Sequence, residues 1–169
     1  MCKQMMSQRQ EIEADIKREV ERCEASIRKD GHIVSPSIVI DLENLFIANK
    51  FYFEENGFCF EDNTRIENGR IRYYAIMRPS FNGKMAENIR KKMREAQKEF
   101  AFHQRVKLQE NFNQRVRETG SRSLAQVLVN MSEIVFENKG YFEDEGYYFE
   151  PIQFSATDNT SFNAWMKVR

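Results

Sequence analysis

A twelve-residue pattern occurs twice in this chain. Residues 50–61 read KFYFEENGFCFE and residues 139–150 read KGYFEDEGYYFE, so that seven identical residues recur at an offset of 89. In each copy apolar and polar residues alternate on both sides of a central glycine, which is typical of a tight β-hairpin. Two such hairpins within 169 residues predict an architecture of two similar halves.

The sequence before each pattern predicts the helices of each half. Apolar residues at helical spacing predict an amphipathic helix over 3–29 that ends at Gly31, with its inward stripe made by Ile12, Ile16, Val20, Cys23 and Ile27. Residues 35–49 also show helical spacing and predict a shorter helix. The second half repeats this order, because a long helix ends at Gly120 and is followed by apolar spacing over 121–138. We therefore expect two copies of a unit of long helix, shorter helix and hairpin.

The hairpin faces predict where the core lies. Asn56-Gly57 favours a two-residue turn, and this turn would bring four aromatic residues to one face, namely Phe51, Phe53, Phe58 and Phe60. A second turn at Asn68-Gly69 is expected to continue the first hairpin as a meander to residue 77. These aromatic faces would be covered by the helices.

The length of the chain favours one domain. A unit of half this size would bury proportionately little surface, so the two copies should share one core. We expect an α+β fold with a long central helix and a single domain over 1–169, made of halves at about 3–77 and 81–154 and a C-terminal tail at 155–169.

Composition narrows the class of protein. The formal net charge is zero, and the three cysteines, Cys2, Cys23 and Cys59, are widely spaced, which argues against a disulfide framework and fits the cytoplasm. There is no apolar run long enough for a signal peptide or a spanning helix. Since no apolar run is long enough, we expect no contact with a membrane. His32 and His103 have no neighbours that would complete a metal or nucleophilic site, so we also expect no metal and no cofactor.

The central helix concentrates positive charge. Between residues 78 and 122 there are twelve Lys or Arg and five Glu, whereas residues 36–63 contain one Lys and six acidic residues. A helix of about 38 residues would be about 57 Å long, longer than a globule of this size is wide. Either the helix kinks near Ala101 or one end projects towards a partner, which includes a second copy of the chain.

The basic residues allow three interpretations. They could follow a phosphate backbone, form an ordinary solvated helix face, or face the acidic hairpins of the same chain. Acidic clusters at the hairpin tips, 54–55 and 143–145, are typical of exposed turns rather than of acid–base sites.

Two stretches resemble known families. IVIDLENL, residues 38–45, is similar to the first strand of PIN-like and NYN nucleases, which implies metal-dependent cleavage through Asp41, Glu43 and Asn44. The similarity ends there, because no alternating β-α chain with further acidic strand ends follows. The order helix, glycine turn, helix and hairpin resembles winged-helix modules, but the helix that would enter DNA is apolar and the hairpins are acidic.

We therefore expect a non-enzymatic protein that binds another macromolecule, most simply a protein-binding adaptor or inhibitor. The alternative is nucleic-acid binding through the basic helix at 84–117. The candidate contact residues are six cations of this helix and three tyrosines on the outer hairpin faces: Arg90, Lys91, Arg94, Lys98, Arg105, Lys107, Tyr52, Tyr141 and Tyr148.

Overall fold

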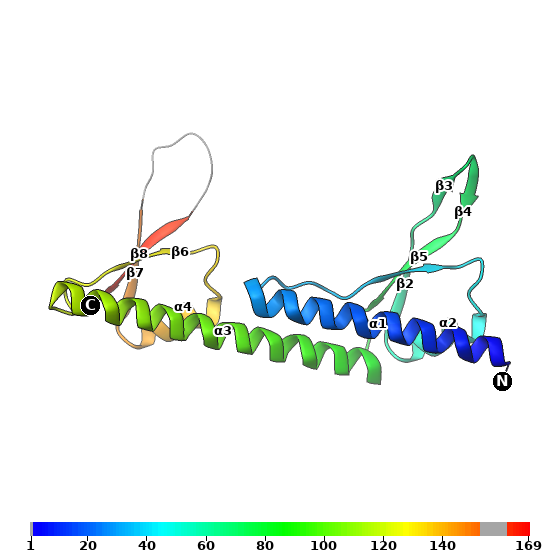
Figure 1. The fold of residues 1–169 in the computed structure, drawn as a ribbon, viewed down its shortest axis with the longest axis horizontal. Helices are drawn as coiled ribbons and strands as arrows, with labels where there is room; N and C mark the ends of the chain where they lie inside the picture. Colours follow the sequence, from blue (N-terminus) through cyan, green and yellow to red (C-terminus); the bar gives the residue numbers. More distant parts are fainter. Residues whose placement is uncertain (1, 153–161) are drawn as a thin grey trace. The chain divides into compact units, whose positions relative to one another are not determined.

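The protein is an α+β chain of helices and antiparallel sheets with a long central helix (Figure 1). The computed structural model describes residues 2–152 and 162–169. The chain divides into two compact units, unit 1 (Met1–Gln97) and unit 2 (Lys98–Arg169). Each of the two hydrophobic clusters lies within one unit, whereas the sequence predicted one core shared by both halves.

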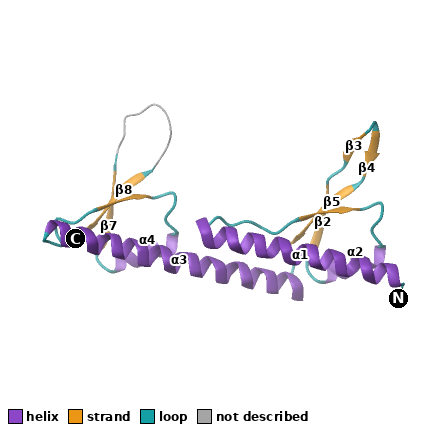
Figure 2. Ribbon diagram, in the orientation of Figure 1, coloured by secondary structure: helices purple, strands orange, loops and turns teal. Residues whose placement is uncertain are grey.

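Unit 1 combines helices with a three-stranded sheet (Figure 2). In chain order its elements are α1 (Lys3–Asp30), β1 (Ile38–Asp41), α2 (Ile47–Glu55), β2 (Phe58–Asp62), β3 (Arg65–Glu67), β4 (Arg70–Arg72), β5 (Tyr74–Pro79) and the first part of α3 (Lys84–Thr119). The sheet is antiparallel with the order β1-β5-β2, and β3 and β4 form a separate hairpin. This hairpin turns at Asn68-Gly69, where both residues have positive φ as a tight two-residue turn requires.

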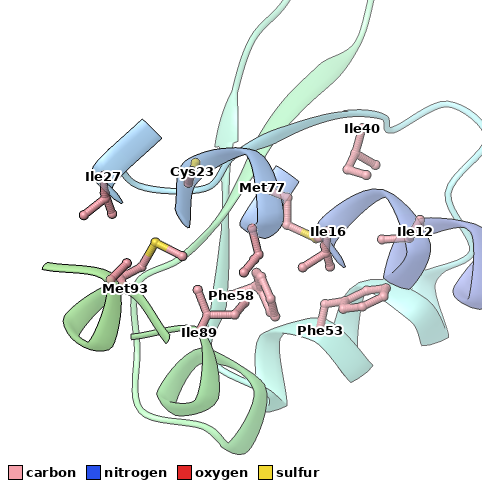
Figure 3. Packing of buried hydrophobic residues seen from close by; sticks show 12 residues of the cluster. Ile12, Ile16, Cys23, Ile27, Ile40, Phe53, Phe58, Met77, Ile89 and Met93 are labelled. Atoms are coloured by element: carbon pink, nitrogen blue, oxygen red, sulfur yellow. The ribbon is translucent and has the colours of Figure 1, made fainter. Parts of the chain in front are cut away.

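The core of unit 1 lies between the helices and one face of the sheet (Figure 3). The stripe predicted on α1 is confirmed, since its five residues are the buried residues of that helix. They pack with residues from α2, the sheet and α3, namely Phe53, Phe58, Met77, Ile89 and Met93. Because burying one such side chain contributes about 1.5–3 kcal/mol, this cluster holds α1 on the sheet.

The predicted hairpin at 50–61 is wrong. Its first half is the helix α2 and its second half is the strand β2, which pairs with β5 rather than with the residues before the turn. Asn49 and Phe53 are both buried and lie four residues apart, so α2 presents one face inwards, while Phe51 is exposed. Gly57 joins the two elements with a φ of 92°.

The predicted helix at 35–49 is also wrong, because β1 lies within it. Ile38, Val39 and Ile40 are consecutive β-branched residues, which favour an extended strand. Strand β1 pairs with β5 in the register Ile40 to Ala75. The arrangement of helix, helix and hairpin therefore does not describe either half, and the resemblance to winged-helix modules loses its basis.

Unit 2 contains the second part of α3 and one three-stranded sheet. Its further elements are β6 (Val127–Asn130), α4 (Phe136–Asp144), β7 (Tyr147–Pro151) and β8 (Asn163–Val168), and the antiparallel order is β6-β8-β7. Their bounds lie 89 residues after those of β1, α2, β2 and β5. As in the first half, the predicted helix at 121–138 contains a strand, and the predicted hairpin at 139–150 is a helix followed by a strand.

The C-terminal segment differs from the predicted tail. Residues 163–168 form β8, the central strand of the sheet, and Met166 is fully buried. A further short strand expected around 152–154 falls mainly on residues 153 and 154, which lie outside the described residues. The core of unit 2 gathers buried residues of α3, α4 and the sheet, including Leu108, Phe112, Phe142 and Tyr147.

The long central helix predicted from the sequence is confirmed. Helix α3 is continuous over 36 residues, and Ala101 lies within it. Its inward residues change from Ile89, Met93 and Ala96 in unit 1 to Leu108 and Phe112 in unit 2. None of the helices in the described part of the chain is long and apolar enough to cross a membrane.

Candidate functional site

The predicted basic contact residues differ in their availability. Lys91, Arg94, Lys98 and Lys107 are exposed on α3, and none of them forms an ion pair within the described residues. Arg90 is only partly exposed and donates a hydrogen bond to the carbonyl of Phe81. The exposed cations can therefore meet a partner, whereas Arg90 is partly occupied within unit 1.

Arg105 is half-buried and contacts residues of α4 in unit 2. Its guanidinium lies 4.5 Å from the centre of the Tyr141 ring, and its Nε donates to Oδ1 of Asn138 at 3.4 Å. Arg105 and Tyr141 therefore contact each other, and Tyr141 remains 38% exposed.

The tyrosines lie on different elements. Tyr52 is on α2, where its hydroxyl donates to Oε1 of Glu13 at 2.9 Å, and burial and this hydrogen bond raise the pKa of the phenol. Tyr148 is on β7, opposite Lys167 of β8, and lies on the outer face of the sheet. Of the three, Tyr148 is the one placed on an open sheet face.

A cluster of polar side chains connects the long and short helices of unit 1. We call Gln8, Arg9, Asn49 and Tyr52 the polar joint of unit 1. Asn49 is fully buried, and its Nδ2 donates to the carbonyl of Met5 and to Oε1 of Gln8, both at 2.9 Å. Arg9 donates from Nε to Oδ1 of Asn49 at 3.1 Å and stacks on Tyr52 at 3.9 Å. Every polar atom of the Asn49 amide thus has a partner.

Gln8 also holds the start of α2. Its Nε2 donates to the carbonyl of Asn44 at 2.7 Å, and its Oε1 accepts from the N–H of Phe46 at 3.1 Å. Phe46 precedes the first residue of α2 and has no side-chain cap of its own. A side chain of α1 therefore satisfies the polar groups of the turn that leads into α2.

Unit 2 contains the same arrangement. We call Gln104, Arg105, Asn138 and Tyr141 the polar joint of unit 2. Asn138 is fully buried and donates to the carbonyl of Ala101 at 2.8 Å and to Oε1 of Gln104 at 3.0 Å. Within the described residues, Asn49 and Asn138 are the two buried polar residues.

Gln104 repeats the contacts of Gln8. It donates to the carbonyl of Glu133 at 2.6 Å and accepts from the N–H of Val135 at 3.1 Å. Val135 likewise precedes a short helix, α4, and has no side-chain cap. These contacts are structural, because they consume the hydrogen-bonding capacity of the buried amide.

The outer face of the sheet in unit 1 presents apolar side chains to solvent. Val39 of β1 lies opposite Ile76 of β5, which in turn lies opposite Glu61 of β2. Val39 is 51% exposed. Arg78, two residues further along β5, forms an ion pair with Glu61 across the strands, and Cys59 lies opposite Arg78.

Unit 2 presents a matching face. Leu128 lies opposite Trp165, and Trp165 lies opposite Glu150, while Lys167 forms an ion pair with Glu150. Leu128 is 52% exposed, close to the value for Val39. Each unit thus carries an apolar pair on its open sheet face, flanked by one cross-strand ion pair.

The acidic residues of the nuclease-like stretch do not form a metal centre. Asp41 accepts from the N–H of Glu43 and from Nδ2 of Asn44, and Arg72 forms ion pairs with both Asp41 and Glu43. Over the ranges that the structure describes, no group of three or more His, Cys, Asp or Glu is placed to hold a metal ion. The carboxylates serve the turn after β1 and its contact with β4.

Comparison with known proteins adds no assignment. No protein-family model, no curated protein and no solved structure matches this chain.

Sequence reasoning missed the open sheet faces and the polar joints. The faces follow from the alternation of β1 and β5, which was hidden because β1 was assigned to a helix. For the joints, the dipeptides Asn49-Lys50 and Asn138-Lys139 recur at the offset of 89, and this repetition was a usable signal. Their partners Gln8 and Gln104 do not recur at that offset, so no repeat pattern connects them.

Proposed function

We propose that this protein is a non-enzymatic protein-binding module, acting as an adaptor or inhibitor, and that the open sheet faces of its two units bind the partner. The observation that carries the proposal is the apolar pair at the centre of each face, Val39 with Ile76 and Leu128 with Trp165. Val39 and Leu128 are about half exposed, and Ile76 and Trp165 are half-buried. The solvated face of an antiparallel sheet is usually polar, so apolar pairs at this position favour burial against another protein.

The surroundings of each pair fit the anatomy of a protein interface. An aromatic or aliphatic centre with a polar rim is typical of such surfaces, and Trp and Tyr are enriched among the residues that contribute most to binding. In unit 2 the centre is Leu128 and Trp165, Tyr148 lies beside it, and Lys167 and Glu150 form the charged rim. Transfer of apolar surface from water contributes about 25 cal/mol per Å².

We further infer that the two units are copies of one fold. Four elements recur at the same offset of 89, the strand orders β1-β5-β2 and β6-β8-β7 correspond, and β2 and β7 share one burial pattern, as do β5 and β8. Two equivalent faces support binding of two similar segments, which gives a bivalent protein higher avidity than either face alone.

A reducing compartment such as the cytoplasm suits this role. Cys2, Cys23 and Cys59 are all free thiols, and Cys59 is partly exposed on the outer face of unit 1. Oxidation at that position would alter the proposed contact surface.

Site-specific photo-crosslinking tests the proposal. A photoreactive residue is placed at Leu128 in the full chain and expressed in the native host, with a control at Ile33, an exposed loop residue of unit 1. We expect a discrete protein adduct from position 128 that is absent from position 33. Excess wild-type protein should suppress this adduct, whereas the variant Leu128→Glu should not. Equal labelling at both positions, or no adduct, would refute the proposal.

Nucleic-acid binding is a second candidate, and one observation favours it. Lys91 and Arg94 in unit 1 and Lys98 and Lys107 in unit 2 are exposed and lack ion pairs among the described residues. Phosphate contacts made by such cations weaken steeply with salt. Fluorescence anisotropy with a labelled single strand and a labelled duplex, at low and moderate salt, should show binding that Lys91→Glu with Arg94→Glu reduces. No binding at low salt would remove this candidate.

A further inference from the structure

Each polar joint connects a long helix, α1 in unit 1 and α3 in unit 2, to the short helix of its unit. The two joints make the same contacts but lie at different positions along their long helices. On the side of the short helix, Asn49 and Asn138 differ by the common offset of 89. On the side of the long helix, Gln8 and Gln104 differ by 96, although their hydrogen bonds correspond one to one. The long helix of unit 2 is therefore seven residues shorter between its joint and its terminal glycine than that of unit 1.

The terminal glycines confirm that the helices end in the same way. Gly31 and Gly120 both have a φ of 75°, and their N–H groups donate to the carbonyls of Ile27 at 2.8 Å and Val116 at 2.9 Å. These pairs differ by 89 and not by 96. The difference in length thus arises in the part of the helix between the joint and the glycine, while the glycine cap itself is the same in both units.

Seven residues are close to two full turns of an α-helix. At 3.6 residues per turn, the inward face returns to within about 20° of its starting direction. Ile12 and Ile16 in unit 1 correspond in this way to Leu108 and Phe112 in unit 2, and all four are buried. The change in length therefore preserves both the joint and the apolar stripe that follows it.

The loop after the helix absorbs the difference. In unit 1 the chain passes from Gly31 to β1 without a turn, whereas in unit 2 residues 122–124 form a turn before β6. Both connections contain the same number of residues, because the glycine and the strand keep the offset of 89. A shorter helix brings its end nearer to the strand, so the same loop needs a turn to take up its length.

The region between the joint and the strand packs differently in the two units. In unit 1 the additional turns carry Val20 and Cys23, which belong to the same cluster as Ile89 and Met93 of α3. Figure 3 labels Cys23, Ile89 and Met93 of this cluster. In unit 2 the guanidinium of Arg122, in the turn, lies 5.5 Å from the centre of the Tyr147 ring. The region beyond the joint therefore differs between the units while the joint itself does not.

We infer that the polar joint fixes the position of the long helix along its axis, and that the end of the helix and the loop after it adapt. An apolar stripe alone allows a helix to move by about one turn with little change in facing direction. Such a shift would separate the buried amide of Asn49 or Asn138 from its glutamine and from the helix carbonyl, and an unpaired buried amide is costly.

A deletion and an insertion in the full chain test this inference. Deleting Lys17–Cys23 makes the spacing from Gln8 to Gly31 equal to that from Gln104 to Gly120. Inserting the same seven residues after Phe112 makes the reciprocal change in unit 2. NMR then follows the side-chain amide of Asn49 or Asn138 through its contacts with α1 or α3 and its slow hydrogen exchange.

We expect the amide of Asn49 to keep its contacts with Met5 and Gln8 in the deletion variant, while residues 31–37 change conformation. Loss of these contacts together with retention of Ile27 in its cluster would overturn the inference, because the far end of the helix would then have kept its place. If the deletion variant does not fold, the insertion decides. In the insertion variant, retained contacts of Asn138 with Ala101 and Gln104 would support the inference that the joint fixes the helix. Loss of these contacts with an unchanged turn at 122–124 would contradict it.

Discussion

The buried amide of Asn138 offers a direct measure of what a polar joint contributes to stability. The substitution Asn138→Ala removes two good hydrogen bonds, at 2.8 and 3.0 Å, and one longer bond from Arg105 at 3.4 Å. We assign about 1 kcal/mol to each of the first two and about 0.5 kcal/mol to the third. The higher helix propensity of alanine returns about 0.5 kcal/mol, so the expected loss is about 2 kcal/mol.

Trp165 provides an assay that is specific for unit 2. It is the single tryptophan of the chain and lies on β8, so its fluorescence during urea denaturation reports the free energy of unfolding of the sheet that α4 packs against. This matters because a chain of two units need not unfold in one step. Asn111→Ala, at an exposed position of α3, is the control and should change the free energy by less than about 0.5 kcal/mol.

The reasoning fails if Asn138→Ala changes the free energy of unfolding no more than the control does. It also fails if Asn49→Ala in unit 1 shifts the Trp165 transition as strongly as Asn138→Ala, because the effect would then not be local to one joint.

Three further predictions concern the core, the glycine turns and pH. Phe142→Ala should cost about 3–5 kcal/mol by Trp165 fluorescence, because Phe142 is fully buried and its ring lies 5.3 Å from that of Tyr147, whereas Phe136→Ala, at an 88% exposed position, should be nearly neutral. Gly57→Ala should lower the melting temperature by circular dichroism more than Gly146→Ala: both glycines have positive φ, but a Cβ at Gly57 would lie 2.6 Å from Cβ of Ala86, and at Gly146 it would meet open space. Equal effects would contradict this packing. Burial and the bond to Glu13 raise the pKa of Tyr52 in the folded state, so its contribution to stability is complete below about pH 10 and is lost as the pH rises through the folded pKa. Ultraviolet titration should show that Tyr52→Phe removes a late tyrosine transition.

The sequence predicted the helices with long apolar stripes and missed the short ones, for a physical reason. Helix α1 and its five buried residues were readable because five apolar residues repeat at helical spacing over several turns. Helices α2 and α4 have nine residues each and no side-chain cap. The group that accepts from the residue before each helix is Gln8 or Gln104, more than thirty residues earlier in the chain, so no local pattern marks where these helices begin.

The same cause explains why two helices were taken for strands. The residues that face inwards on α2 are Asn49 and Phe53, and a polar residue is not counted when apolar spacing is read. Without Asn49, the remaining Phe51 and Phe53 alternate with period two and indicate a strand. The buried asparagine is intelligible only together with its partners on α1, which the sequence does not bring near it.

The candidate binding faces could not be predicted, because the residues of β1 and β6 were expected to be helical. Once β1 is extended, Val39 and Ile40 must point to opposite faces, and the burial of Ile40 leaves Val39 in solvent. The same alternation in β6 leaves Leu128 exposed, whereas its neighbours Val127 and Val129 are buried. When the apolar residues on both faces of a short strand are counted together, their spacing resembles that of a helix. The inward and the outward residues can be distinguished only when it is known which face of the sheet is covered. An exposed apolar residue in the middle of such a run therefore gives no signal in sequence, although it is the feature on which partner binding is proposed to depend.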